Sequence, residues 1–229
     1  MTAETPDYIG HRQRLKQRFL VDNGKSMPDY ELLELLLMAF IPRKDVKPIA
    51  KKLLQRFGSL AGIQDADAED LMSIEGIKEN TVTNLKIVKA INVRSTWRTL
   101  ESGETPILNS QDRLEDYCRS AMGHLDVEEC RIFFLNNKLS IIGEEILQRG
   151  TINHVTIHPR EFIKLVLNKK AEAIILAHNH PSGDTTPSHA DIEMTRLLKE
   201  ALETIDVRLL DHVIISKNQV YSFNRHHVI

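Results

Sequence analysis

Two histidines, a serine and an aspartate stand close together in the segments HNH (178–180) and SHAD (188–191). The histidines follow the apolar run 173–177, which is typical of a buried strand. Residues two apart on a strand point to the same face, so His178 and His180 are predicted to converge on one point. Ser188 and Asp191 are three apart, which places them on one face at the start of a helix. Two imidazole nitrogens and one carboxylate form the ligand set of a catalytic zinc ion, with a fourth position open for water.

The pair Ser188 and Asp191 also fits a capping box, in which the serine caps a helix and the acid three residues later reaches back. Capping and metal ligation are compatible only in part, because each would use one oxygen of the carboxylate. We therefore expect the start of the helix itself to position the third ligand.

A hydrolytic metal site also needs a general base that is not itself a ligand. The nearest candidates upstream are Glu144 and Glu145, in the predicted strand 140–147. Alternation places one of them on each face of the sheet, and the apolar Ile142 suggests by parity that Glu144 faces inward. Gly150 follows the strand, and a bulge there would shift the phase. Alternation alone therefore leaves both glutamates open.

The elements that must hold these residues in place form an α/β domain with a mixed sheet. Strands are predicted at 130–135, 140–147, 173–177, 207–210, 212–216 and 220–223, and helices at 159–167 and from residue 188 onward. A turn at 136–138 makes the first two strands a hairpin. Asp211 and His212 lie at a predicted strand start, where they are candidates to contact a ligand histidine.

The first hundred residues are predicted to be helical. Apolar spacing predicts helices over 28–40, with a proline in the first turn, and over 46–57, closed by a glycine at 58. The segment LMSIEGIKEN (71–80) has the pattern of a helix-hairpin-helix, in which Gly76, Ile77 and Lys78 would contact a DNA phosphate. Any tight helical hairpin, however, also favours a glycine at its turn. Small polar residues near 101–106 predict two domains, 1–103 and 104–229, and an α+β fold overall.

The composition is that of a soluble globular protein, with 229 residues of which 41% are hydrophobic and 27% charged. The net charge of -2 argues against a globally basic nucleic-acid binder. We interpret the basic run from Arg12 to Arg18 as a solvated helix face. Cys118 and Cys130 form no CxxC pair and are expected to be free thiols. The absence of a signal-peptide core and of a membrane-spanning apolar stretch predicts a cytoplasmic protein without a membrane partner.

The pattern of a glutamate, His-x-His, seven residues and Ser-x-x-Asp resembles the signature of the JAB/MPN metalloprotease family. The segments EEILQRGTINHVTIHPREF, AHNHPSGDTTPS and LLDHVII, together with the helical first half, resemble the RadC family over nearly the whole chain. In RadC-like sequences the acidic residue lies six positions before the threonine of a Gly-Thr pair, here Gly150-Thr151. The resemblance therefore assigns the base to Glu145, against the parity argument, and leaves Glu144 as the fallback.

The same resemblance implies that His178, His180 and Asp191 hold Zn²⁺, that Glu145 takes a proton from the attacking water, and that Ser188 donates a hydrogen bond to the oxyanion. It implies a zinc-dependent hydrolase, a metallopeptidase with a protein or peptide substrate. The alternative is a DNA-associated repair or recombination factor, whose helical half binds DNA and whose metal domain is accessory. No feature of the sequence specifies an oligomeric state.

Overall fold

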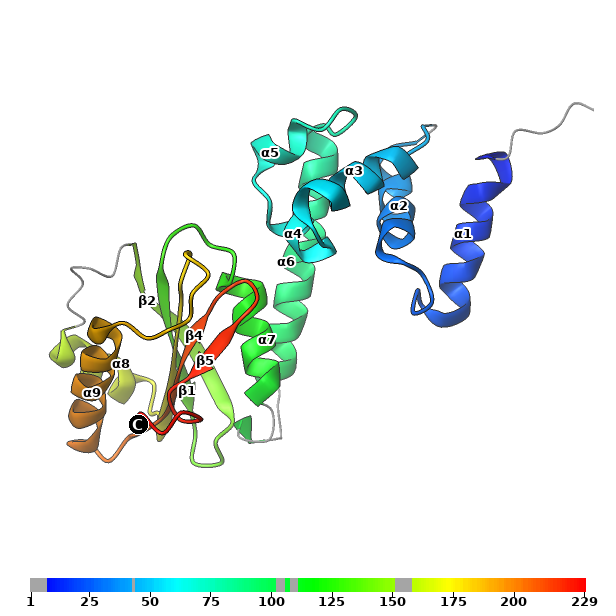
Figure 1. Cartoon of the computed structure of the whole chain (residues 1–229). Helices are drawn as coiled ribbons and strands as arrows, with labels where there is room; N and C mark the ends of the chain where they lie inside the picture. Colours follow the sequence, from blue (N-terminus) through cyan, green and yellow to red (C-terminus); the bar gives the residue numbers. More distant parts are fainter. Residues whose placement is uncertain (1–7, 43, 102–105, 108–110, 151–157) are drawn as a thin grey trace, which may run out of the picture. The chain divides into compact units, whose positions relative to one another are not determined.

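The computed structural model describes residues 8–42, 44–101, 106–107, 111–150 and 158–229 of the chain (Figure 1). The chain divides into two compact units, Met1–Asn92 and Val93–Ile229. The division lies inside the long helix α6 (Glu79–Glu101), so the last turns of this helix belong to the second unit. The domain boundary expected at 103–104 falls outside the described residues.

The described residues of the first unit are helical, as predicted. The unit contains α1 (Tyr8–Asp22), α2 (Asp29–Phe40), α3 (Lys47–Phe57), α4 (Leu60–Asp65), α5 (Ala68–Met72) and the first part of α6. Its core is built from the apolar faces of α2, α3 and α6, with Leu37, Leu53 and Leu85 almost fully buried. Gly58 ends α3 with a φ of 79°, a left-handed conformation that glycine adopts without steric cost.

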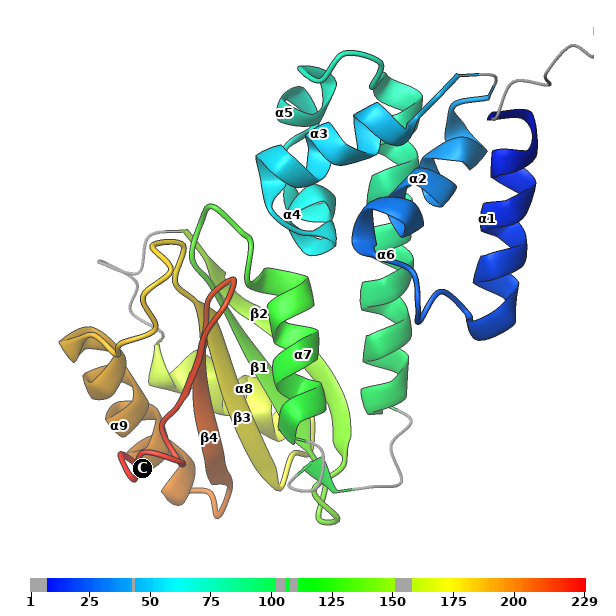
Figure 2. The ribbon, with the colours of Figure 1, turned by 45° about the vertical axis from the view of Figure 1, so that its right-hand side comes forward.

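The second unit is a five-stranded mixed sheet with helices on both faces, which confirms the expected fold class. Its strands are β1 (Glu129–Leu135), β2 (Ile141–Arg149), β3 (Ala173–Asn179), β4 (Arg208–Ile215) and β5 (Val220–Ser222), in the order β2-β1-β3-β4-β5. Helix α7 (Gln111–Met122) covers one face, whereas α8 (Pro159–Asn168) and α9 (His189–Glu203) cover the other (Figure 2). Cys118 and Cys130 are buried free thiols, as expected.

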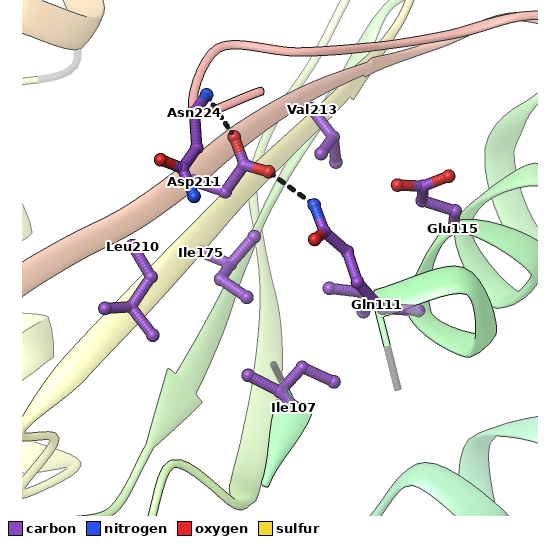
Figure 3. A pocket seen from close by; sticks show the side chains of 9 residues that line it. Ile107, Gln111, Glu115, Ile175, Leu210, Asp211, Val213 and Asn224 are labelled. Atoms are coloured by element: carbon purple, nitrogen blue, oxygen red, sulfur yellow. Dashed lines mark hydrogen bonds between the residues drawn. The ribbon is translucent and has the colours of Figure 1, made fainter. Parts of the chain in front are cut away.

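Two features of this unit differ from the sequence prediction. The segments 207–210 and 212–216 form one strand, β4, with a register shift where it passes β3. The sequence prediction left Asp211 outside both segments. Its carboxylate is instead buried and accepts hydrogen bonds from the Gln111 side chain and from the backbone N–H of Asn224 (Figure 3). It also accepts one from the Ser222 hydroxyl. Helix α7, which contributes Gln111, was not anticipated.

The topology brings distant parts of the chain to one end of the sheet. Strands β3 and β4 are parallel and are joined by the crossover helix α9. The C-terminal end of β3 and the N-terminus of α9 therefore meet at the same edge, which is where α/β folds usually build their sites. The segments 178–180 and 188–191 lie at these two ends.

Candidate metal centre

Among the described residues, one group of side chains has the composition and spacing of a metal site: His178, His180 and Asp191. The Nε2 atoms of the two histidines lie 2.9 Å apart. Oδ1 of Asp191 lies 3.2 Å from Nε2 of His178, and its Oδ2 lies 3.6 Å from Nε2 of His180. The structure thus brings together the three predicted ligands, two from the end of β3 and one from the first turn of α9.

His178 is fully buried, and its second ring nitrogen is also engaged. Nδ1 lies 2.7 Å from Nε2 of His212 on the neighbouring strand β4. His212 is also fully buried, and its ring stacks on Phe223 at a centroid distance of 4.7 Å. Burial, together with the nearby His178, holds the pKa of His212 well below its ordinary value, so His212 is neutral. Of the two residues expected to contact a proposed ligand histidine, Asp211 and His212, it is His212 that contacts His178.

His180 is held by the loop that follows it. Its Nδ1 lies 2.7 Å from the backbone carbonyl oxygen of Asp184, and because a carbonyl only accepts, Nδ1 carries the proton. Nε2 is then the nitrogen that faces the cluster. Contact with the Asp191 carboxylate raises the pKa of His180, against the opposing effect of burial.

Asp191 divides its two oxygens between the helix cap and the cluster. Its Oδ2 accepts hydrogen bonds from the backbone N–H of Ser188 at 2.8 Å and from the Ser188 hydroxyl at 2.6 Å. The backbone N–H of Asp191 donates to Ser188 Oγ in return, which completes the predicted capping box. Burial would raise the pKa of Asp191, but contacts with His178, His180 and Ser188 outweigh it and lower the pKa far below its usual range. The carboxylate is therefore ionised, and Oδ1 is the oxygen that faces His178.

This donor set fits a divalent zinc ion. Zinc prefers imidazole nitrogen and carboxylate oxygen, and three protein ligands are typical of catalytic sites. Ligand histidines usually donate their other ring N–H to a neighbouring acceptor, as His180 does to the Asp184 carbonyl. The two Nε2 atoms and the anionic carboxylate of Asp191 converge on one point, where a bound cation would neutralise the carboxylate.

The two candidate bases lie on opposite faces of the sheet. Glu145 pairs with Ile132 of β1, and Ile132 pairs with Leu176 of β3, two residues before His178. Glu145 and His178 therefore project from the same face. Glu144 pairs with Phe133 and lies on the face of α7.

The contacts of the two glutamates are also different. Glu144 accepts a hydrogen bond from the Tyr117 hydroxyl at 2.5 Å and forms an ion pair with Arg131 at 3.2 Å. Glu145 forms an ion pair with Lys169, with 2.6 Å between Oε1 and Nζ. It does not belong to the cluster of His178 and its neighbours.

Asn179, between the two histidines, is a buried polar residue whose contacts the sequence did not predict. It is fully buried, and its Oδ1 accepts the backbone N–H of Glu129 at 2.7 Å. Its Nδ2 donates to the carbonyl oxygens of Leu125 and Val127. Asn179 thus ties the segment before β1 to the strand that carries the ligands. The sequence offered one sign of these contacts. Asparagine is unfavourable in β-strands, so its presence within a predicted strand indicates that its side chain has specific partners.

In the first unit, the segment that contains Gly76, Ile77 and Lys78 joins α5 to α6. Gly76 has a φ of +94°, and a Cβ on it would lie 2.8 Å from Cδ1 of Ile49. The N–H of Ile77 donates to the carbonyl of Ile74 within the turn, and the Ile77 side chain is buried in the core. Lys78 is exposed just before α6. Packing against Ile49 and the left-handed backbone thus explain why residue 76 is a glycine. Of the three predicted DNA contacts, Lys78 is the one whose side chain is exposed to solvent.

Comparisons with known proteins cover most of the chain. Residues 108–228 match the family model of the RadC-like JAB domain, and residues 8–83 match that of the UPF0758 N-terminal domain. The chain is 43% identical to a UPF0758 protein of Ruegeria pomeroyi over 219 residues, which cover 95% of this chain and 97% of that protein. None of the described helices is both long and apolar enough to cross a bilayer.

Proposed function

Because this chain belongs to the RadC family, we propose that its second unit is a zinc-dependent hydrolase, a metallopeptidase that cuts an amide bond in a protein or peptide. The observation that carries this proposal is the convergence of two histidine Nε2 atoms and one buried carboxylate at the end of β3. A purely structural role would not require two histidine Nε2 atoms and a carboxylate to converge.

In this proposal, His178 and His180 would hold the ion through Nε2, and Asp191 would hold it through Oδ1. When bound, the ion would polarise the scissile carbonyl and bring the pKa of its water to about 7. The capping box supports the role of Asp191, because it fixes the carboxylate through Oδ2 and leaves Oδ1 toward His178. The ionised state of Asp191 also suits a cation ligand.

Glu145 is the proposed general base, and its position on the same face of the sheet as His178 supports that role. Its carboxylate must leave the pair with Lys169 to take a proton, and both side chains of that pair are partly exposed to solvent. Ser188 is the proposed donor to the developing oxyanion. Its hydroxyl donates to Asp191 in this structure and would turn toward the substrate carbonyl.

Peptide cleavage in labelled water tests this function. Zinc-loaded full-length protein is incubated with a peptide library in H₂¹⁸O, and products are analysed by mass spectrometry. Hydrolysis should introduce one ¹⁸O into each new carboxyl group, should stop with chelator and should return with zinc. His180→Ala serves as the matched inactive variant. Protein with full zinc occupancy that cleaves no peptide would contradict the proposal.

A second candidate function is that of a DNA-associated repair or recombination factor that binds DNA through the first unit. One observation favours it. Nζ of Lys44 would lie 3.1 Å from a Cβ atom placed on Gly76, so Lys44 lies next to the turn that carries Lys78, and both lysines are exposed. Two ammonium groups beside the N-terminus of α6 would suit a phosphate. Fluorescence anisotropy with branched DNA should show salt-dependent binding that Lys44→Gln plus Lys78→Gln weakens. Equal binding by the double variant, or none by the wild type at low salt, would exclude it.

A further inference from the structure

We propose that His212 and Thr195 are positioning residues of the metal centre. They form a buried hydrogen-bonded relay from the backbone of Asp191 to the ring of His178, which keeps Nε2 of His178 unprotonated and ready to bind a cation. This role rests on the proposed function, in which His178 is a ligand. It assigns a positioning role to His212 and Thr195, which are not ligands themselves.

The relay contains three contacts. The Thr195 hydroxyl lies 2.5 Å from the carbonyl oxygen of Asp191, one helical turn earlier in α9. The same hydroxyl lies 2.6 Å from Nδ1 of His212. Nε2 of His212 then lies 2.7 Å from Nδ1 of His178. An uninterrupted chain of hydrogen bonds therefore joins the backbone of one proposed ligand to the side chain of another.

The chemistry of the end group fixes the direction of the relay. A carbonyl oxygen carries no proton, so the Thr195 hydroxyl must donate to Asp191. The hydroxyl has no second proton, so it accepts from His212, whose Nδ1 is protonated. A neutral imidazole has a single N–H, so Nε2 of His212 accepts from Nδ1–H of His178. Nε2 of a neutral His178 is then left with a lone pair, and it faces Asp191 and His180.

Burial makes the relay rigid. The side chains of His178 and His212 are fully buried, and Thr195 is 1% exposed. In such a setting an unpaired polar group is unfavourable, so a relay in which every member has a partner is favoured. The three residues lie on β3, β4 and α9, and the relay therefore holds together the elements that carry the ligands.

Loss of the hydroxyl should reverse the relay. In Thr195→Val, Nδ1 of His212 faces a methyl group, which cannot accept a hydrogen bond. The tautomer of His212 that is protonated on Nδ1 is therefore no longer favoured. The ring would then carry the proton on Nε2 and donate it to Nδ1 of His178. His178 would be protonated on Nε2, the atom needed for the ion. Thr195→Ser keeps the hydroxyl and is the matched control.

The experiment measures the tautomer and the zinc affinity separately. Nitrogen-15 NMR of metal-free, full-length protein reports which ring nitrogen of His178 is protonated, and the signal is assigned by its loss in His178→Ala. Zinc affinity is measured by competition with a chromogenic chelator, and circular dichroism verifies the fold of each variant. We expect wild type and Thr195→Ser to be protonated on Nδ1 and Thr195→Val on Nε2. Zinc affinity should fall about 10- to 100-fold in Thr195→Val and stay within about threefold in Thr195→Ser.

The possible failures can be told apart. A Thr195→Val protein that keeps the proton on Nδ1 of His178 and binds zinc as tightly as the wild type would overturn the relay. A His178 ring protonated on Nε2 in the wild type would also overturn it. A wild type with the expected tautomer but no zinc affinity would instead contradict the proposed function.

Discussion

Glu145 and His178 project from the same face of the sheet, although they lie on the two strands that flank β1. Ile132 of β1 pairs with Glu145 on one side and with Leu176 on the other, so all three project from one face. His178 is two residues after Leu176 and therefore projects from that face as well. Glu144 projects from the opposite face, toward Tyr117 of α7. Of the two neighbouring glutamates, Glu145 therefore shares a face with the candidate metal centre, and the two should respond differently to substitution.

We expect Glu145→Gln to abolish peptide hydrolysis while leaving zinc affinity and folding close to wild type. The partly exposed ion pair with Lys169 contributes at most about 1 kcal/mol to stability. Glu144→Gln should keep activity but lose about 1–3 kcal/mol, because it weakens the contacts with Tyr117 and Arg131. Peptide cleavage and urea unfolding measure the two effects. An active Glu145→Gln protein would remove Glu145 from the base role.

Zinc should stabilise the wild type through Asp191. At free zinc about 100 times the dissociation constant, linkage predicts a gain of about 2.7 kcal/mol in the free energy of unfolding. Asp191→Asn removes the ligand charge while retaining an oxygen that can accept in the helix cap, so this variant should fold but gain little from zinc. Thermal unfolding with and without zinc tests the expectation. Equal zinc-dependent shifts in both proteins would place the ion elsewhere.

Asn179→Ala should destabilise the protein. The substitution leaves the Glu129 N–H and the carbonyl oxygens of Leu125 and Val127 without their side-chain partner. Unsatisfied buried groups cost about 1–3 kcal/mol each, so a loss of that order or more is expected in urea unfolding. Lys217→Ala, at an exposed position after β4, is the control and should be neutral. An unchanged midpoint for Asn179→Ala would show that the tie is dispensable.

Gly76→Ala tests the packing explanation for the glycine at the turn between α5 and α6. A left-handed φ of +94° and a close approach to Ile49 should make this variant less stable by about 1–3 kcal/mol, whether or not the protein binds DNA. Lys78→Gln should leave stability unchanged, because its side chain is exposed. Thermal unfolding and DNA anisotropy of both variants are the measurements. A Gly76→Ala protein as stable as the wild type would refute the packing explanation.

The sequence predicted the proposed ligands because their geometry is local. His178 and His180 share a face by strand alternation, and Ser188 and Asp191 form the predicted capping box. Long-range partners were harder to predict. The contact between His178 and His212 depends on β3 and β4 being neighbours, so the position of Asp211 and His212 at a predicted strand start could suggest it only as one candidate.

Alternation could not choose between Glu144 and Glu145 for a physical reason. The parity argument took the apolar Ile142 as a marker of the buried face, but Ile142 is 41% exposed on an edge strand. Helices cover both faces of this sheet, so an inward direction does not distinguish one face from the other. The motif resemblance selected Glu145, the residue on the face of His178. The division of β4 into two predicted segments was wrong because a buried carboxylate at residue 211 is compatible with a continuous strand when partners as distant as Gln111 satisfy it.

Anomalous diffraction at the zinc edge tests the central claim most directly. Crystals of the full-length protein grown with zinc should show an anomalous density peak about 2.0–2.2 Å from each of three atoms, Nε2 of His178, Nε2 of His180 and Oδ1 of Asp191. Crystals of Asp191→Asn grown under the same conditions should lack it. Wild-type crystals with no peak at this position, or with zinc bound only at other residues, would contradict the account.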